Sequence, residues 1–92
     1  MKAPANVERG AAFLDERDPN WPNKIDVGRL DLGDCERCIL GQLYVDYDEA
    51  LTELSLSARE AERLGFNTVG PQRYWHLTAG WIREVLSRRT AA

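Results

Sequence analysis

The stretch from Pro71 to Arg89 most constrains how this chain can fold, because it carries a helical pattern long enough for the other segments to pack against. Its large side chains recur every three or four residues, which is the spacing of one buried helical face. These residues are Tyr74, Leu77, Trp81 and Val85, with Thr78 and Ile82 beside them. Pro71 suits the first helical position, and the final arginines suit the carboxyl end of the helix dipole. We therefore predict a long helix over Pro71–Arg89 with one core-facing stripe.

The apolar surface of this helix is wider than that stripe. Trp75 and Leu86 lie to one side of it. They either extend the core or form a surface that offers its aromatic side chain to a partner. The small pair Ala79-Gly80 in the middle would let a neighbouring helix approach closely.

The first twenty residues contain another helical pattern. We expect residues 1–5 to be disordered, as chain ends often are. Asn6 is a candidate N-cap for a helix that runs to about Arg17, and Pro19 would end it. The residues on the core-facing side of this helix are Val7, Ala11 and Leu14.

The segment 18–33 is irregular, with two prolines and two glycines. It nevertheless carries too many large apolar residues for a free linker. They are Trp21, Ile25, Val27, Leu30 and Leu32. We predict a wrapped segment with one or two single helical turns and its apolar side chains in the core. A small β-hairpin between Ile25 and Leu32 is the alternative, because apolar and acidic residues alternate there.

Capping signals predict the helices of the middle of the chain. Asp34 is a candidate cap for a helix over Cys35–Tyr44. The capping-box pattern Asp46-Tyr-Asp-Glu49 predicts a new helix over Tyr47–Leu54. The apolar positions stay in helical phase across the join, so a single helix over 34–54 is the alternative.

A second capping box, Ser57-Ala-Arg-Glu60, predicts a short helix that ends near Leu64. Gly65 is a C-terminal stop signal, and Phe66 would fold back onto the core after it. Together these signals predict an all-α fold in which four to five mostly short helices pack on a long C-terminal helix.

The length and composition indicate one small domain over residues 1–92. Its 43% hydrophobic and 29% charged residues are typical of globular proteins. No apolar run approaches the ~20 residues that a membrane span needs, and the N-terminus lacks the hydrophobic core of a signal peptide. We therefore expect a cytoplasmic protein that does not engage a membrane.

The net charge of −3 hides an asymmetry between the two parts of the chain. Residues 1–57 carry 6 Lys/Arg and 12 Asp/Glu, whereas residues 58–92 carry 6 Arg and 3 Glu. A chain polarised in this way can attract its own halves, associate with a second copy or offer an acidic face to a basic partner. A homodimer is therefore among the expected assemblies.

Two cysteines and one histidine are the candidates for metal or thiol chemistry. A helix start would lower the thiol pKa of Cys35 and Cys38, but redox enzymes normally place such a pair after a strand, and no strand is predicted. A structural zinc ion needs four ligands, and these two residues with His76 supply three. His76 also lacks a catalytic nucleophile or acid nearby in the sequence. We therefore expect reduced, packed cysteines, no metal and no cofactor.

The segment from Leu56 to Leu64 resembles the opening of LuxR-type helix-turn-helix domains, whose first helix often starts with a similar Ser/Thr-x-Arg-Glu. This resemblance implies DNA binding. However, Gly65-Phe66-Asn67 interrupts the pattern, and no Lys/Arg-rich recognition helix follows at the usual distance. The C-terminal arginines keep nucleic-acid binding open as an alternative, although an acidic chain binds nucleic acid at a salt-dependent cost.

The layout "FLDE…P.W…ID…LDL..C..CILGQLY", from Phe13 to Tyr44, resembles small uncharacterised proteins of actinobacteria and their phages. The resemblance covers most of the chain and implies a cytoplasmic setting and a phage or prophage origin. It implies no activity, and no residue takes a role from it. The layout groups Trp21, Leu30, Leu32, Cys35, Cys38 and Gln42. We interpret that group as the wrapped segment docking on the cysteine helix.

These observations predict a non-enzymatic protein-interaction module, for which a phage-type modulator of a host protein is one form. The alternatives are a nucleic-acid-binding regulator that uses the basic C-terminal helix and a zinc- or thiol-dependent protein that uses Cys35 and Cys38. The predicted partner-binding residues are Tyr74, Trp75, His76, Arg83 and Arg88.

Overall fold

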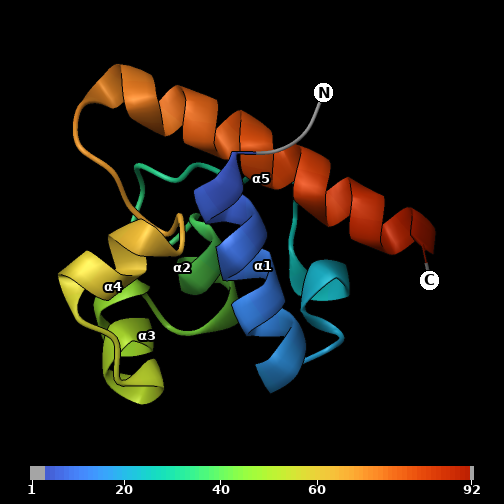
Figure 1. Ribbon diagram of the computed structural model, residues 1–92, viewed down its shortest axis with the longest axis horizontal. Helices are drawn as coiled ribbons and strands as arrows, with labels where there is room; N and C mark the ends of the chain where they lie inside the picture. Colours follow the sequence, from blue (N-terminus) through green and yellow to red (C-terminus); the bar gives the residue numbers. More distant parts are fainter. Residues whose placement is uncertain (1–3, 92) are drawn as a thin grey trace.

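The computed structural model describes residues 4–91, whose regular structure consists of helices (Figure 1). In chain order these are α1 (Ala5–Arg17), the short 3-10 helix η1 (Trp21–Lys24), α2 (Ile39–Leu43), α3 (Tyr47–Leu54), α4 (Ala58–Arg63) and α5 (Pro71–Ala91). The described residues contain no β-strand, which confirms the predicted all-α fold. α5 runs along one side of the molecule, and α1 crosses beneath it (Figure 1).

The two longest helices approach closely because glycines lie at their contacts. A Cβ atom on Gly80 of α5 would lie 2.8 Å from Cδ of Pro4, which precedes α1. A Cβ atom on Gly10 of α1 would lie 1.9 Å from the carbonyl oxygen of Leu64, at the end of α4. The predicted close approach of a neighbouring helix is therefore confirmed at Gly80, where the start of α1 packs, whereas Ala79 is exposed.

Aromatic rings link α5 to the rest of the core. Trp81 is fully buried, stacks on Phe66 at a centroid distance of 5.5 Å and meets the edge of Trp21 at 5.9 Å. Its indole N–H donates a hydrogen bond of 2.6 Å to the carbonyl oxygen of Gly65. Such pairs add roughly 0.5–1.5 kcal/mol each beyond the area that they bury. The predicted core stripe is confirmed at Leu77, Trp81 and Val85, which are all buried.

The segment 18–33, here called the strap, wraps across the core as predicted. It contains the single turn η1, and its large apolar residues Trp21, Ile25, Leu30 and Leu32 are buried. The alternative of a β-hairpin is wrong, because the backbone at residues 27–29 forms a turn between non-strand segments. Arg89 of α5 donates hydrogen bonds to the carbonyl oxygens of Pro22 and Ile25, so the last turn of α5 holds the strap.

Gln42 of α2 holds the strap from another side. Its side-chain carbonyl accepts a 2.7 Å hydrogen bond from the N–H of Asp26, and its amide donates to the carbonyl oxygens of Asp26 (3.2 Å) and Arg37 (3.0 Å). This contact confirms that the wrapped segment docks on the segment that carries the cysteines.

The helix predicted over Cys35–Tyr44 is wrong at its start, because α2 begins only at Ile39. Asp34 caps a separate turn, in which its side chain accepts from the N–H groups of Glu36 and Arg37. The carbonyl of Arg37 accepts from Asp31 in the strap and from Gln42, so a continuous helix would compete with these contacts.

Cys38, with an extended backbone, caps α2 through its sulfur, which accepts from the N–H of Gly41 at 3.2 Å. The alternative of one helix over 34–54 is also wrong. Extended backbone at Tyr44 and Asp46 separates α2 from α3, and Asp46 caps α3 by accepting from the N–H of Glu49 at 2.8 Å.

The ends of the other helices follow local signals. α4 begins with the predicted capping box of Ser57 and Glu60. It ends before Gly65, whose φ of +75° is the left-handed conformation that favours glycine, and Phe66 folds back with 1% exposure.

The start of α1 differs from the prediction. α1 begins at Ala5 rather than after an Asn6 cap, because the side chain of Asn6 bonds the adjacent N–H of Val7. Of residues 1–5, for which we predicted disorder, residues 1–3 lie outside the described part of the chain, and Ala5 is the first residue of α1.

Candidate functional site

The outward face of α5 carries an unusual run of apolar residues. Trp75 is 78% exposed and Leu86 is 44% exposed, while Ala79 between them is exposed and Ile82 is partly buried. These four residues, here called the α5 seam, are spaced by four, three and four positions, so they form one stripe about 17 Å long on the helix. The buried stripe of Leu77, Trp81 and Val85 lies on another face, so α5 is apolar on two sides.

A groove runs between the α5 seam and the strap. Two adjoining hollows of about 380 Å³ each share Trp75 and Asp31. One of them continues along Leu30, Thr78 and Ile82. The hydroxyl oxygen of Thr78 accepts a 3.0 Å hydrogen bond from the N–H of Leu32, which fixes the strap at this distance from α5. The groove therefore has apolar walls with the exposed carboxylate of Asp31 at the strap side.

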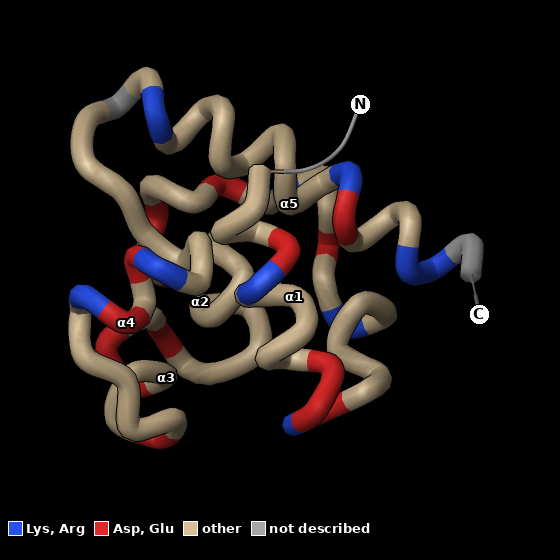
Figure 2. Tube along the Cα trace, viewed as in Figure 1, with Lys and Arg blue, Asp and Glu red and all other residues tan. Residues whose placement is uncertain are grey.

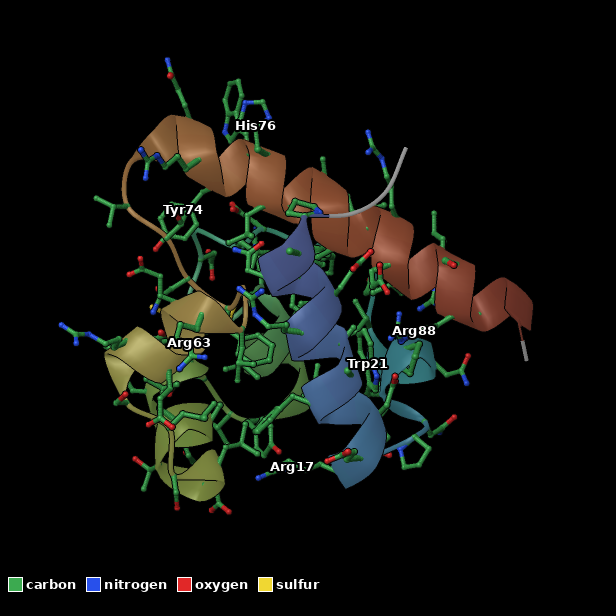
Figure 3. The ribbon with its side chains drawn as sticks, in the orientation of Figure 1. Arg17, Trp21, Arg63, Tyr74, His76 and Arg88 are labelled. Atoms are coloured by element: carbon green, nitrogen blue, oxygen red, sulfur yellow. The ribbon has the colours of Figure 1, made fainter. Side chains whose placement is uncertain are left out.

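The predicted group Tyr74-Trp75-His76 does not form one patch. Successive helical residues point about 100° apart, so the three side chains diverge. Tyr74 is half-buried and faces the body of the molecule, whereas His76 is exposed and points away from it (Figure 3). Of the three, Trp75 is the residue that projects from the groove edge as a large exposed apolar side chain.

The predicted contact arginines have different environments. Arg83 is exposed, and the described residues give it no hydrogen bond or ion pair. Arg88 instead pairs with Asp15 of α1, at 2.9 Å, and with Glu84 one turn earlier. Asp15 also accepts a 2.8 Å hydrogen bond from the indole N–H of Trp21. Arg88 therefore connects α5 to α1 and is committed within the molecule.

The contacts between Asp15 and Arg88 shift the pKa values of both groups. The Arg88 hydrogen bonds hold the pKa of Asp15 below its usual value, and they outweigh the opposing effect of burial. The hydrogen bond from Trp21 adds a smaller lowering. The Asp15 hydrogen bonds raise the pKa of Arg88 in turn. Both shifts are explained by a structural ion pair and do not indicate catalysis.

Charge is divided between segments, as the sequence suggested. α5 carries four arginines, while acidic residues occur along the strap and on α3 (Figure 2). Since Arg88 and Arg89 are held by α1 and the strap, Arg73 and Arg83 are the exposed arginines of α5, and of these two Arg83 lies beside the seam.

The two cysteines lie in different environments. Cys38 is buried and caps α2, and burial raises its pKa to about 11, so its thiol is poorly nucleophilic. Cys35 is exposed and borders a hollow of about 360 Å³ together with Cys38, Tyr47 and Tyr74. His76 does not line that hollow, and the described residues contain no group of three metal-ligating side chains.

Two contacts that shape this region left no pattern in the sequence: Thr78 accepts from the strap, and Asp15 pairs with Arg88. A buried Trp21 signals that some acceptor must meet its indole N–H. The identity of that acceptor depends on packing between α1 and the strap, which the sequence does not reveal.

Comparisons with protein-family models, curated proteins and solved structures gave no match to this chain. The resemblance to small actinobacterial and phage proteins therefore stays a prediction. Within residues 4–91, no helix combines the length and the apolar character needed to cross a membrane.

Proposed function

We propose that this protein is a non-enzymatic protein-interaction module whose contact surface is the outward face of α5. The observation that carries the proposal is the 78% exposure of Trp75 in line with Ala79, Ile82 and Leu86. Exposed apolar stripes of this kind mark interaction sites, and tryptophan is enriched among residues that dominate binding energy. Modulation of a host protein by a phage-type factor is one form that such a function takes.

The surroundings of Trp75 support binding rather than catalysis. The groove on one side of Trp75 has apolar walls and the carboxylate of Asp31. Arg83 and His76 lie on the other side of Trp75, away from the groove. Asp15 and Arg88, whose pKa values are shifted, hold α1 and α5 together and do not line the groove. The nucleic-acid alternative receives less support, because Arg88 and Arg89 are committed within the molecule.

An affinity-capture experiment tests the proposal. Immobilised wild-type protein is compared with Trp75→Ser and with Val45→Ser, a matched control because Val45 is 69% exposed in the turn between α2 and α3. We expect a reproducible set of captured proteins that is lost with Trp75→Ser and kept with Val45→Ser. Capture that does not depend on Trp75, or no reproducible capture at all, would contradict the proposal.

A further inference from the structure

We propose that a second copy of this chain occupies the α5 seam, in a dimer whose two α5 helices pack in parallel with Arg83 of each copy beside the partner's Asp31. This inference rests on the proposed function, since it names an occupant for the same face.

The spacing of the α5 seam suits packing against another helix. Apolar residues separated alternately by four and three positions form the contact line of two-stranded helical coils. Ala79 in the middle is small enough to let two helices approach to the 8–10 Å typical of packed pairs. Trp75 and Leu86 at the two ends supply exposed apolar area that water would leave on association.

The borders of the α5 seam are complementary to one another. The groove beside it has an acidic border at Asp31 and therefore fits an apolar helix with a cation on its flank. α5 is such a helix, because Arg83 lies just beyond the seam on the side away from the strap. Asp31 is exposed, and one of its carboxylate oxygens accepts from the N–H of Gly33, which leaves the other for a partner. One chain thus carries both halves of the contact.

The arrangement of these borders selects the parallel orientation. The strap lies on the Thr78 side of the seam, and Arg83 lies on the opposite side. A two-fold axis along the helices brings the strap of one copy beside Arg83 of the other. An axis perpendicular to the helices would instead place Asp31 near the partner's Asp31 and Arg83 near the partner's His76. Attraction between unlike charges favours the first arrangement.

The dimer is expected to be weak. The seam spans about three helical turns, so even with the strap the contact lies near the roughly 1,000 Å² at which specific interfaces begin. We therefore expect a dissociation constant on the order of 10–100 μM. This range makes the association reversible and sensitive to single substitutions.

Sedimentation velocity over a range of concentrations tests the dimer, in reducing buffer because Cys35 is exposed. Trp75→Ser, Arg83→Glu and Asp31→Lys are each expected to weaken association at least about tenfold. Asp31→Asn keeps an acceptor for Gly33 and should also weaken it, which separates loss of charge from loss of the turn. The control Arg73→Glu removes an exposed arginine of α5 outside the seam and should change association less than about twofold.

The double variant Arg83→Glu with Asp31→Lys gives the sharpest test, because it reverses both charges and should restore most of the association lost by each single variant. The orientation is tested by Leu86→Cys in a Cys35→Ser background, oxidised with diamide, because Leu86 at the end of the seam meets its own copy only when the two helices are parallel. A parallel dimer places the two introduced thiols opposite each other and should form the cross-link efficiently, whereas Arg73→Cys should not.

A protein that sediments as a single chain at all concentrations would overturn the dimer. So would a dimer that ignores the charge variants, or an assembly larger than two copies. Failure of the dimer can be distinguished from failure of the proposed function. If the protein is monomeric but Trp75→Ser abolishes capture of another protein, the dimer is wrong and the interaction module stands. If it dimerises through Trp75 but captures nothing, the dimer stands and modulation of another protein is wrong.

Discussion

The two cysteines of this protein differ in their surroundings although they are three residues apart. Cys38 is buried, accepts from the N–H of Gly41 and has a pKa raised to about 11, whereas the Cys35 side chain lies at the surface. Because the thiolate is the reactive form, the two thiols should react at different rates. Of the two, Cys38 therefore has a structural role as the N-cap of α2.

We predict that iodoacetamide at about pH 8 labels Cys35 in the folded protein and reaches Cys38 only after unfolding in urea. Mass spectrometry of the intact and digested protein distinguishes the two sites. Equal labelling of both thiols in the folded state would show that Cys38 is not buried as described. Complete protection of both would point instead to a disulfide or a bound metal.

The ion pair of Asp15 and Arg88 should make stability depend on pH in a defined direction. The folded-state pKa of Asp15 lies below its unfolded value, so its contribution is complete above the unfolded pKa of about 3.9 and is lost as the pH falls through the folded pKa. The carboxylate is 44% exposed, so water screens the pair and the contribution is at most about 1 kcal/mol.

Asp15→Asn removes the charge and keeps an acceptor for the indole of Trp21. Urea unfolding should show the wild type to be more stable than this variant at about pH 6, and the difference should shrink as the pH falls below the unfolded pKa of about 3.9. A difference that persists unchanged at low pH would mean that packing, rather than the ion pair, accounts for it.

At the level of helices, the contact of α1 with α4 and α5 depends on Gly10. A Cβ atom there would lie 1.9 Å from the carbonyl oxygen of Leu64 and 2.9 Å from the ring of Trp81. Gly10→Ala should therefore destabilise the protein by about 2–3 kcal/mol, because backbone on one side and a buried ring on the other resist the shift.

Thermal or urea unfolding checks this prediction. Gly33→Ala is the control, since its Cβ would meet atoms only at ordinary contact distances of 3.4 Å or more, and it should change stability by less than about 0.5 kcal/mol. Equal effects of the two substitutions would contradict the close packing of α1.

The strap depends on Gln42, whose amide bonds both backbone groups of Asp26. Gln42→Ala should cost about 1–2 kcal/mol of stability and speed hydrogen exchange at the N–H of Asp26. The control Gln72→Ala removes an exposed glutamine of α5 and should do neither. If exchange at Asp26 is unchanged, the strap is held without Gln42.

Some helix boundaries follow local chemistry and others do not. The caps at Asp46 and Ser57 and the stop at Gly65 depend on residues within one turn, so the sequence predicted α3 and α4 closely. The start of α2 depends on the carbonyl of Arg37, which the strap recruits through Asp31. Because that contact forms only when the strap docks, a local pattern could not predict it.

For the molecule as a whole, the candidate site was only partly predictable. The wide apolar surface of α5 suggested that Trp75 would be either core or exposed, and only the positions of α1 and the strap decide that it is exposed. Arg88 was expected to meet a partner protein. It meets Asp15 instead, 73 residues earlier in the chain, and such a long-range pair leaves no local sequence pattern.

The three tryptophans lie in two kinds of environment, the core and the exposed face of α5. The indole N–H of Trp21 donates to Asp15 and that of Trp81 donates to Gly65, and both rings are fully buried. Trp75 alone among them is exposed, at the edge of the groove where a second copy is proposed to bind. The signals of Trp21 and Trp81 therefore report on the core, and the signal of Trp75 reports on the proposed dimer contact.

A dilution series of ¹⁵N-labelled protein, followed by NMR at the three indole N–H signals, tests the central claim most directly. We predict that the Trp75 signal shifts with protein concentration, while the signals of Trp21 and Trp81 stay in place because their donors remain bonded in the core. A Trp75 signal that does not move with concentration, or three signals that move together, would contradict self-association through the α5 seam.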